Sequence, residues 1–257
     1  MEKAYLNTSI GKIEYTIRSG NPLIVFLNSF GSFDTAQSFS RVIKELPEHF
    51  GIFAPDYLNT GFSGKSTAPY TLSNEAAELA KIINGLNAEA VIVVAHSIGG
   101  VYALQMSKQI DRLRAFVGIE PTTREIFLNP PQEAAYLKKE REAEDSEEII
   151  YCKITDLFSA EEAEEFWQTT AENSDKFDET ANQNAVNAMQ MDRFWQDSNR
   201  LDDSIPAIIV TESYRQEEYE RSEYFNHNAG SKVVALGSFH YIQWEYPEEI
   251  RKLIVSL

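Results

Sequence analysis

The chain has 257 residues, 43% of them hydrophobic and 12% aromatic, a composition that excludes a disordered protein and allows one large core. Its 40 acidic and 23 basic residues give a formal net charge of -17, which argues against nucleic acid and anionic membrane surfaces as partners. No apolar run is long enough to cross a bilayer, the N-terminus lacks the apolar segment of a signal peptide, and the single cysteine, Cys152, fits a reducing compartment, so we expect a cytoplasmic protein.

Strand patterns and helix patterns alternate along most of the chain. The first two expected strands, at residues 4–8 and 12–18, alternate roughly between apolar and polar side chains. We expect the others at residues 22–27, 51–56, 90–96, 113–120, 206–211 and 232–236. The first four of these are continuous apolar runs, typical of strands buried on both faces. Helical patterns lie between them, at residues 34–47, 73–86, 98–109, 216–228 and from about 247 onward. Strands that alternate with helices predict an α/β fold with a mostly parallel, doubly wound sheet of eight strands.

The pattern changes after Pro121. Residues 122–203 contain no convincing strand and are rich in Glu, Ala, Gln and Asn, with aromatic side chains recurring between acidic ones. We interpret this segment as a helical insertion with an acidic outer face and an aromatic inner face. The sequence therefore predicts a core formed by residues 1–121 and 204–257, with residues 122–203 as a helical cap, or lid.

The segment 91–104 carries the strongest chemical signal. A buried strand runs into Ser97, and two glycines and an apolar helix follow. A serine exposed at such a sharp strand-to-helix turn, a nucleophile elbow, needs small residues two positions before and after it. Gly99 supplies the second, whereas Ala95 stands where a glycine is usual. The helix would aim its N-terminal dipole at the site, although a serine in this position can also simply cap a helix.

This arrangement resembles the α/β-hydrolase family over nearly the whole chain. Three further segments are similar to segments of the family, in the same order: residues 27–32, 55–66 and 237–240. In the first of them, Asn28-Ser29 replaces the family's His-Gly, so this match is partial. The resemblance implies an α/β-hydrolase sheet with an inserted cap, a serine nucleophile and a C-terminal catalytic histidine.

A serine hydroxyl needs a base that takes its proton before it becomes a good nucleophile. The chain has four histidines. We expect His49 and His227 on the surface, and His96 should point away from the hydroxyl of Ser97. By elimination and by its match to the family's C-terminal segment, His240 is the expected base; the alternative is a loop histidine without a role.

The acid that would orient this histidine has two candidates. In many relatives it follows the seventh strand, where only Glu212 is available, and in others it follows the sixth, where Glu120 ends an apolar run. We favour Glu120, because it lies next to the elbow at the edge of the sheet where ligands gather. Each glutamate could instead form an ordinary salt bridge. The resemblance assigns the two oxyanion-hole donors to the backbone N–H groups of Phe30 and Ile98.

These residues predict an enzyme and a reaction class. Ser97 argues against dehalogenase and epoxide hydrolase chemistry, which needs a carboxylate nucleophile, and the sequence lacks recognisable motifs for a metal or a cofactor, so we expect neither. We predict a carboxylesterase-like hydrolase that cleaves a small or medium, largely apolar ester through an acyl-enzyme on Ser97. Acyltransferase, lyase and aminopeptidase activities remain open, as does a ligand-binding or sensor protein on a retired hydrolase scaffold, which the departures at Ala95 and Asn28 would favour.

Overall fold

The computed structural model describes residues 1–29, 31, 33–128, 147–176 and 200–257. Eight strands form one sheet in the order β1-β2-β4-β3-β5-β6-β7-β8. Strand β2 is antiparallel to β1 and β4, and all other neighbours pair in parallel. The strands are β1 Glu2–Asn7, β2 Lys12–Arg18, β3 Leu23–Leu27, β4 Gly51–Pro55, β5 Val91–His96, β6 Leu113–Ile119, β7 Ala207–Thr211 and β8 Lys232–Ala235. The predicted eight-stranded, mostly parallel sheet is thereby confirmed.

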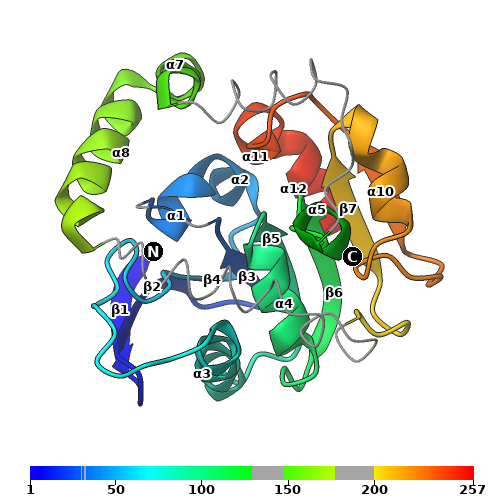
Figure 1. The fold of residues 1–257 in the computed structure, drawn as a ribbon, viewed down its shortest axis with the longest axis horizontal. Helices are drawn as coiled ribbons and strands as arrows, with labels where there is room; N and C mark the ends of the chain where they lie inside the picture. The colour runs from blue at the N-terminus through cyan, green and yellow to red at the C-terminus, as the bar shows by residue number, and fades with distance from the viewer. Residues whose placement is uncertain (30, 32, 129–146, 177–199) are drawn as a thin grey trace.

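Helices cover both faces of this sheet (Figure 1). One face packs against α3 (Leu72–Gly85), α4 (Gly99–Ser107) and α10 (Gln216–Glu220). The other packs against α1 (Thr35–Ser38), α2 (Ser40–Glu45), α11 (Ile242–Glu245) and α12 (Pro247–Val255). The central strands β3 to β7 are buried almost throughout, as their continuous apolar sequences require. Among the residues that the structure describes, no helix is both long and apolar enough to cross a membrane.

Two predicted helices differ from the observed ones. The helix expected over residues 34–47 is interrupted at Phe39, which separates α1 from α2. The helix expected over residues 216–228 ends at Glu220, because the following residues turn back into the core. Tyr224 stacks on Phe116 of the sheet, with 5.6 Å between ring centroids, and Asn226 donates to the backbone oxygen of Ile205 at 2.8 Å. These long-range contacts outweigh the local helical preference.

The loop after β4 is organised around a buried carboxyl group. The two oxygens of Asp56 accept backbone N–H groups of Thr35 and Phe62, each at 2.8 Å. Gly61 has a φ of 47°, and a Cβ there would overlap the carboxyl group of Asp56, so only glycine fits. Burial, and secondly the neighbouring Asp34 carboxyl, raise the pKa of Asp56 to about 8. The segment 55–66, which resembles a family loop, thus ties β4 to α1 at the carboxyl edge of the sheet.

Three α-helices are described within the segment after Pro121: α5 (Arg124–Leu128), α7 (Glu147–Leu157) and α8 (Ala160–Asn173). An aromatic cluster joins α7 and α8 to the loop between β8 and α11. Its fully buried or nearly buried members are Ile154, Phe158, Ala163, Phe166, Phe239, Tyr241 and Trp244. Phe158 and Phe166 are therefore buried, as expected of an aromatic inner face, whereas Tyr151 of α7 is 55% exposed. The domain boundaries at residues 122 and 203 stay a prediction.

Candidate active site

Ser97 occupies a strained turn between β5 and α4. Its φ is 52°, in the left-handed region that a residue with a side chain rarely adopts. Two backbone hydrogen bonds fix this turn to the end of β6: Ser97 donates to Ile119 at 3.1 Å, and the carbonyl of Ser97 accepts from Thr122 at 3.0 Å. The side chain is half-buried. The turn therefore has the backbone that a nucleophile elbow requires.

The two small residues that flank Ser97 are explained by their neighbours. A Cβ on Gly99 would overlap the backbone oxygen of Leu27, so the close approach of α4 to β3 requires glycine. Ala95 lies within β5 and pairs with Gly118 of β6. Gly118 has no side chain and Ala95 is fully buried, so the fold accepts a methyl group at the position where a glycine is usual.

Of the two expected oxyanion donors, one can be located. Ile98 directly precedes α4 in helical conformation and is buried. The N–H groups of a first helical turn have no partner within the helix and are available to an anion. Phe30 lies outside the described residues. Its neighbour Asn28 is buried, and the carbonyl of Asn28 accepts the hydroxyl of Tyr57 at 3.0 Å.

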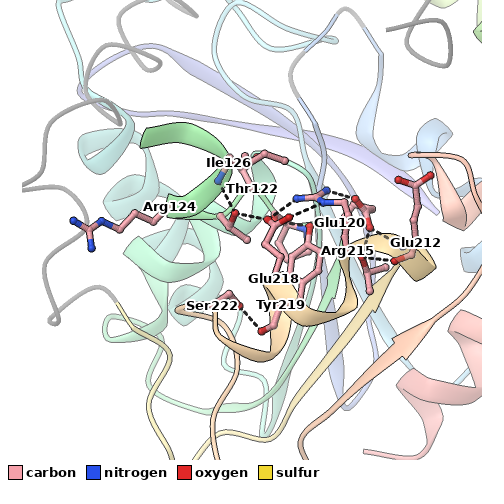
Figure 2. Close-up of polar contacts among 12 residues, drawn as sticks. Glu120, Thr122, Arg124, Ile126, Glu212, Arg215, Glu218, Tyr219 and Ser222 are labelled. Atoms are coloured by element: carbon pink, nitrogen blue, oxygen red, sulfur yellow. Dashed lines mark hydrogen bonds and ion pairs between the residues drawn. The ribbon is translucent and has the colours of Figure 1, made fainter. Parts of the chain in front are cut away.

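Glu120 lies at the tip of β6 with a φ of 45°, and its side chain is fully buried (Figure 2). Oε1 accepts the backbone N–H of Glu212 at 2.8 Å and the hydroxyl of Thr211. Oε2 forms an ion pair with Nη1 of Arg215 and lies 3.9 Å from Nδ1 of His240. The structure therefore brings Glu120 and His240 together, at a distance that allows an electrostatic contact but exceeds a hydrogen bond.

The surroundings of Glu120 keep it ionised. Burial raises the pKa of this carboxyl, but the charge of Arg215, the nearby His240 ring and the hydroxyl of Thr211 outweigh burial and bring the pKa to about 2. Glu120 is consequently a carboxylate at any pH at which a histidine acts as a base. This is the ionisation state that a histidine needs in the acid that orients it.

His240 lies in the loop between β8 and α11, and its side chain is 24% exposed. The buried ring of His96 holds this loop: its Nε2 lies 3.1 Å from the backbone oxygen of His240, and the two ring centroids are 4.6 Å apart. Burial, and secondly the neighbouring His240, lower the pKa of His96 well below 6.5, so His96 is neutral and donates from Nε2. Ser97 follows His96 directly, so β5 delivers the serine to the edge of the sheet where His240 lies.

Comparison with known proteins places this geometry in a family. The sequence profile of the alpha/beta hydrolase family matches residues 24–253, which is most of the chain. The chain belongs to the alpha/beta hydrolase family. Its membership and its structural neighbours support a hydrolase-type enzyme.

Two curated relatives of this chain are similar to it over only part of their own length. A protein of Mycobacterium tuberculosis that is described as uncharacterized is 30% identical over 99 residues, 38% of this chain and 28% of the relative. A Haemophilus influenzae protein whose name assigns it provisionally to the esterases and lipases is 29% identical over 108 residues, 42% of this chain and 36% of the relative. The chain thus matches about a third of the length of these relatives.

Solved structures are similar over the whole chain. A crystal structure from Streptococcus mutans has 26% sequence identity and a TM-score of 0.85, and the match covers 99% of this chain and 96% of the other. The N-acyl homoserine lactonase AidH, in complex with N-butanoyl homoserine, has 16% identity and a TM-score of 0.73, with 100% and 96% covered. At such low identity the second likeness shows the fold alone.

The structure also locates the other glutamate and two of the other histidines that were considered for the acid and the base. Glu212 is buried at the end of β7, where its backbone N–H binds Glu120. Burial, and secondly the carboxylate of Glu212, raise the pKa of Tyr214. His49 and His227 are exposed, as expected. Within the described residues, no three His, Cys, Asp or Glu side chains are grouped as ligands for a metal ion.

Sequence reasoning missed two residues that contact the candidate site. Arg215 pairs with Glu120, and its only signal in the sequence is a position in the loop after β7, three residues before Glu218. His96 carries no signal of its contact with His240, because 144 residues separate them in the chain. Both contacts arise when the sheet brings the ends of several strands to one edge.

Proposed function

We propose that the protein is a serine hydrolase that cleaves small or medium carboxylic esters through an acyl-enzyme on Ser97. His240 is the base, Glu120 the acid that orients it, and the backbone N–H groups of Ile98 and Phe30 are the oxyanion donors. One observation carries the proposal: a serine in a left-handed turn at the tip of β5 donates its backbone N–H to the end of β6, where an ionised Glu120 lies 3.9 Å from His240.

The reaction follows the logic of a Ser-His-acid triad. Nε2 of His240 takes the proton of Ser97, whose Oγ attacks the ester carbonyl and forms a tetrahedral oxyanion. The N–H groups at the start of α4 stabilise this charge. When the intermediate collapses, His240 returns the proton to the leaving alcohol. A water molecule, deprotonated by His240, then releases the acid and regenerates Ser97. Glu120 remains ionised throughout and stabilises the imidazolium.

Three observations favour esters as the substrate class. A serine nucleophile suits acyl transfer, whereas dehalogenases and epoxide hydrolases need a carboxylate at this position. A curated relative that matches part of the chain is named among esterases and lipases. Phe239 and Tyr241, on either side of His240, belong to the aromatic cluster with α7 and α8, which favours an apolar acyl group and a role of this segment as a lid.

The proposal is tested with p-nitrophenyl esters of increasing acyl length. We expect Ser97→Ala to lower kcat/KM by at least about a thousandfold, since the rest of a triad cannot replace its nucleophile. Ser256→Ala, at the C-terminal end of the chain, is the matched control and should keep the wild-type rate. Equal turnover by wild type and Ser97→Ala would refute a nucleophilic serine.

A ligand-binding protein on the same scaffold is the second candidate, because Oε2 of Glu120 is paired with Arg215 and lies 3.9 Å from His240. Catalytic contacts are often long without substrate, so this distance does not exclude catalysis. A fluorophosphonate probe separates the two functions, since only an activated serine reacts with it. Mass spectrometry should find the probe on Ser97; an unlabelled protein would favour the binding role.

A further inference from the structure

A buried arginine shares the carboxylate that faces the proposed base. The side chain of Arg215, from the short helix η4 (Ser213–Arg215), is only 7% exposed and pairs with Oε2 of Glu120 (Figure 2). The same oxygen faces Nδ1 of His240. The positive guanidinium and the imidazole therefore compete for one carboxylate oxygen.

A second acid balances the arginine. Nε and Nη2 of Arg215 donate to the two carboxylate oxygens of Glu218, at 3.0 and 2.8 Å, in a bidentate pair. Three side chains, Glu120, Arg215 and Glu218, thus form an alternating row of charges with a net charge of about one negative unit. A bidentate arginine pair fixes both the position and the orientation of the guanidinium.

The row continues to the start of the inserted segment. Thr123 donates to Glu218 at 2.5 Å, and its hydroxyl accepts the backbone N–H of Ile126 at the beginning of α5. Tyr219, whose ring lies under the guanidinium, donates to the carbonyl of Pro121 at 3.0 Å. The chain that follows Glu120 is thereby tied to helix α10, whose Glu218 binds Arg215.

We propose that Arg215 is a positioning residue: it fixes the carboxylate of Glu120 and neutralises part of the negative charge that faces His240. Glu218 in turn counterbalances the positive charge of Arg215. This inference rests on the proposed role of His240 as the base. A carboxylate that served His240 alone would stabilise the imidazolium more strongly and hold the proton longer. Arg215 therefore keeps His240 available as a base at lower pH.

Other charged or titratable side chains surround the pair of Glu120 and His240 and contribute to the electrostatic potential at the imidazole. Within the described residues, those from the elements packed around Glu120 and His240 are His96, Glu212, Tyr214, Glu218, Tyr219 and Tyr241. Burial lowers the pKa of His96 and raises those of Tyr214 and Tyr219, so these three are neutral near pH 7. Arg215 is positive and Glu218 is negative, so removing one charge or the other should shift the titration of His240 in opposite directions.

The experiment follows the His240 ring directly by NMR titration of the free protein. Four histidines give few imidazole signals, and the signal that disappears in His240→Asn assigns His240. In Arg215→Met we expect the midpoint of this titration to move up by about one pH unit, because a positive charge is removed next to the imidazolium. In Glu218→Gln it should move down by a few tenths of a unit, because Arg215 loses its counter-charge. Arg215→Lys should return the midpoint toward that of the wild type.

The signs of the two shifts decide the result. If Arg215 only stabilised the fold, its loss would lower the melting temperature and leave the midpoint in place. An unchanged midpoint in Arg215→Met and Glu218→Gln, or shifts in the same direction, would overturn the proposal. If Arg215→Met does not fold, the downward shift in Glu218→Gln still tests it. Because the titration needs no substrate, its failure is distinguishable from a failure of the ester assay with Ser97→Ala.

Discussion

A buried acid behind the elbow makes the stability of the protein depend on pH. Glu75 of α3 is fully buried; its Oε1 accepts the backbone N–H of Leu58 at 2.5 Å, and its Oε2 bonds the hydroxyl of Tyr102 at 2.6 Å. Tyr102 belongs to the helix that begins after Ser97 and stacks on Tyr57, which binds Asn28. Burial raises the pKa of Glu75 to about 7, although both hydrogen bonds lower it.

The shift has a definite sign and size. Because the folded state holds this proton more tightly than the unfolded chain, the stabilisation by Glu75 is complete below pH 4.5 and is lost as pH rises to about 7. The difference corresponds to at most about 3 kcal/mol. Glutamine carries one donor and one acceptor where protonated glutamic acid does. We therefore expect Glu75→Gln to be as stable as the wild type near pH 4.5, and more stable by up to about 3 kcal/mol above pH 8.

Urea unfolding of wild type and Glu75→Gln at about pH 5 and pH 8.5 measures this effect. The matched control is Glu78→Gln on the same helix, where Glu78 forms a surface ion pair with Lys81; its effect should be below about 1 kcal/mol and similar at both pH values. A free energy difference between wild type and Glu75→Gln that does not grow with pH would refute the assigned proton. So would a Glu75→Gln protein that is less stable than the wild type at pH 8.5.

Two further substitutions test packing at the site. In Gly99→Ala the new methyl group overlaps the backbone oxygen of Leu27. We therefore expect the unfolding free energy to fall by at least about 2 kcal/mol and most of the ester turnover to be lost. A fully active, stable protein would contradict the close approach of α4 to β3. Phe166→Ala removes the fully buried ring of α8 from the aromatic cluster and should cost about 3 kcal/mol or more and expose α8 to proteolysis, whereas Trp167→Ala, at a half-buried neighbour, should cost less.

The parts of the fold that the sequence predicted are those with strong periodicity. Every expected strand exists, because a run such as residues 90–96 is too apolar to lie anywhere but in the centre of the sheet. The helix expected to extend to residue 228 is wrong in its last eight positions. In this stretch Tyr224 and Asn226 fit the pattern of a polar helix in the sequence. Each of them contacts a residue that is distant in the chain, and periodicity does not reveal such contacts.

For the candidate site, the sequence indicated Ser97, His240 and Glu120 but not the residues that hold them. Ser97 was recognisable because strand, turn and helix follow each other locally. Arg215 and His96 were not, since their contacts with Glu120 and with the His240 loop join strand ends that are distant in the chain. Such contacts depend on the strand order of the sheet rather than on any local pattern.

Local sequence patterns also leave open which of the two candidate acids orients His240. Strands β6 and β7 are neighbours, so Glu120 and Glu212 lie at the same edge of the sheet. Both are glutamates, and either carboxylate could orient a histidine. The chain at Glu120 adopts a φ of 45°, and its carboxylate receives the backbone N–H of Glu212. The end of β7 therefore supplies a donor to the carboxylate at the end of β6. A residue that uses its backbone in this way supports the acid on the neighbouring strand, which is why we assign the role to Glu120 and a supporting one to Glu212.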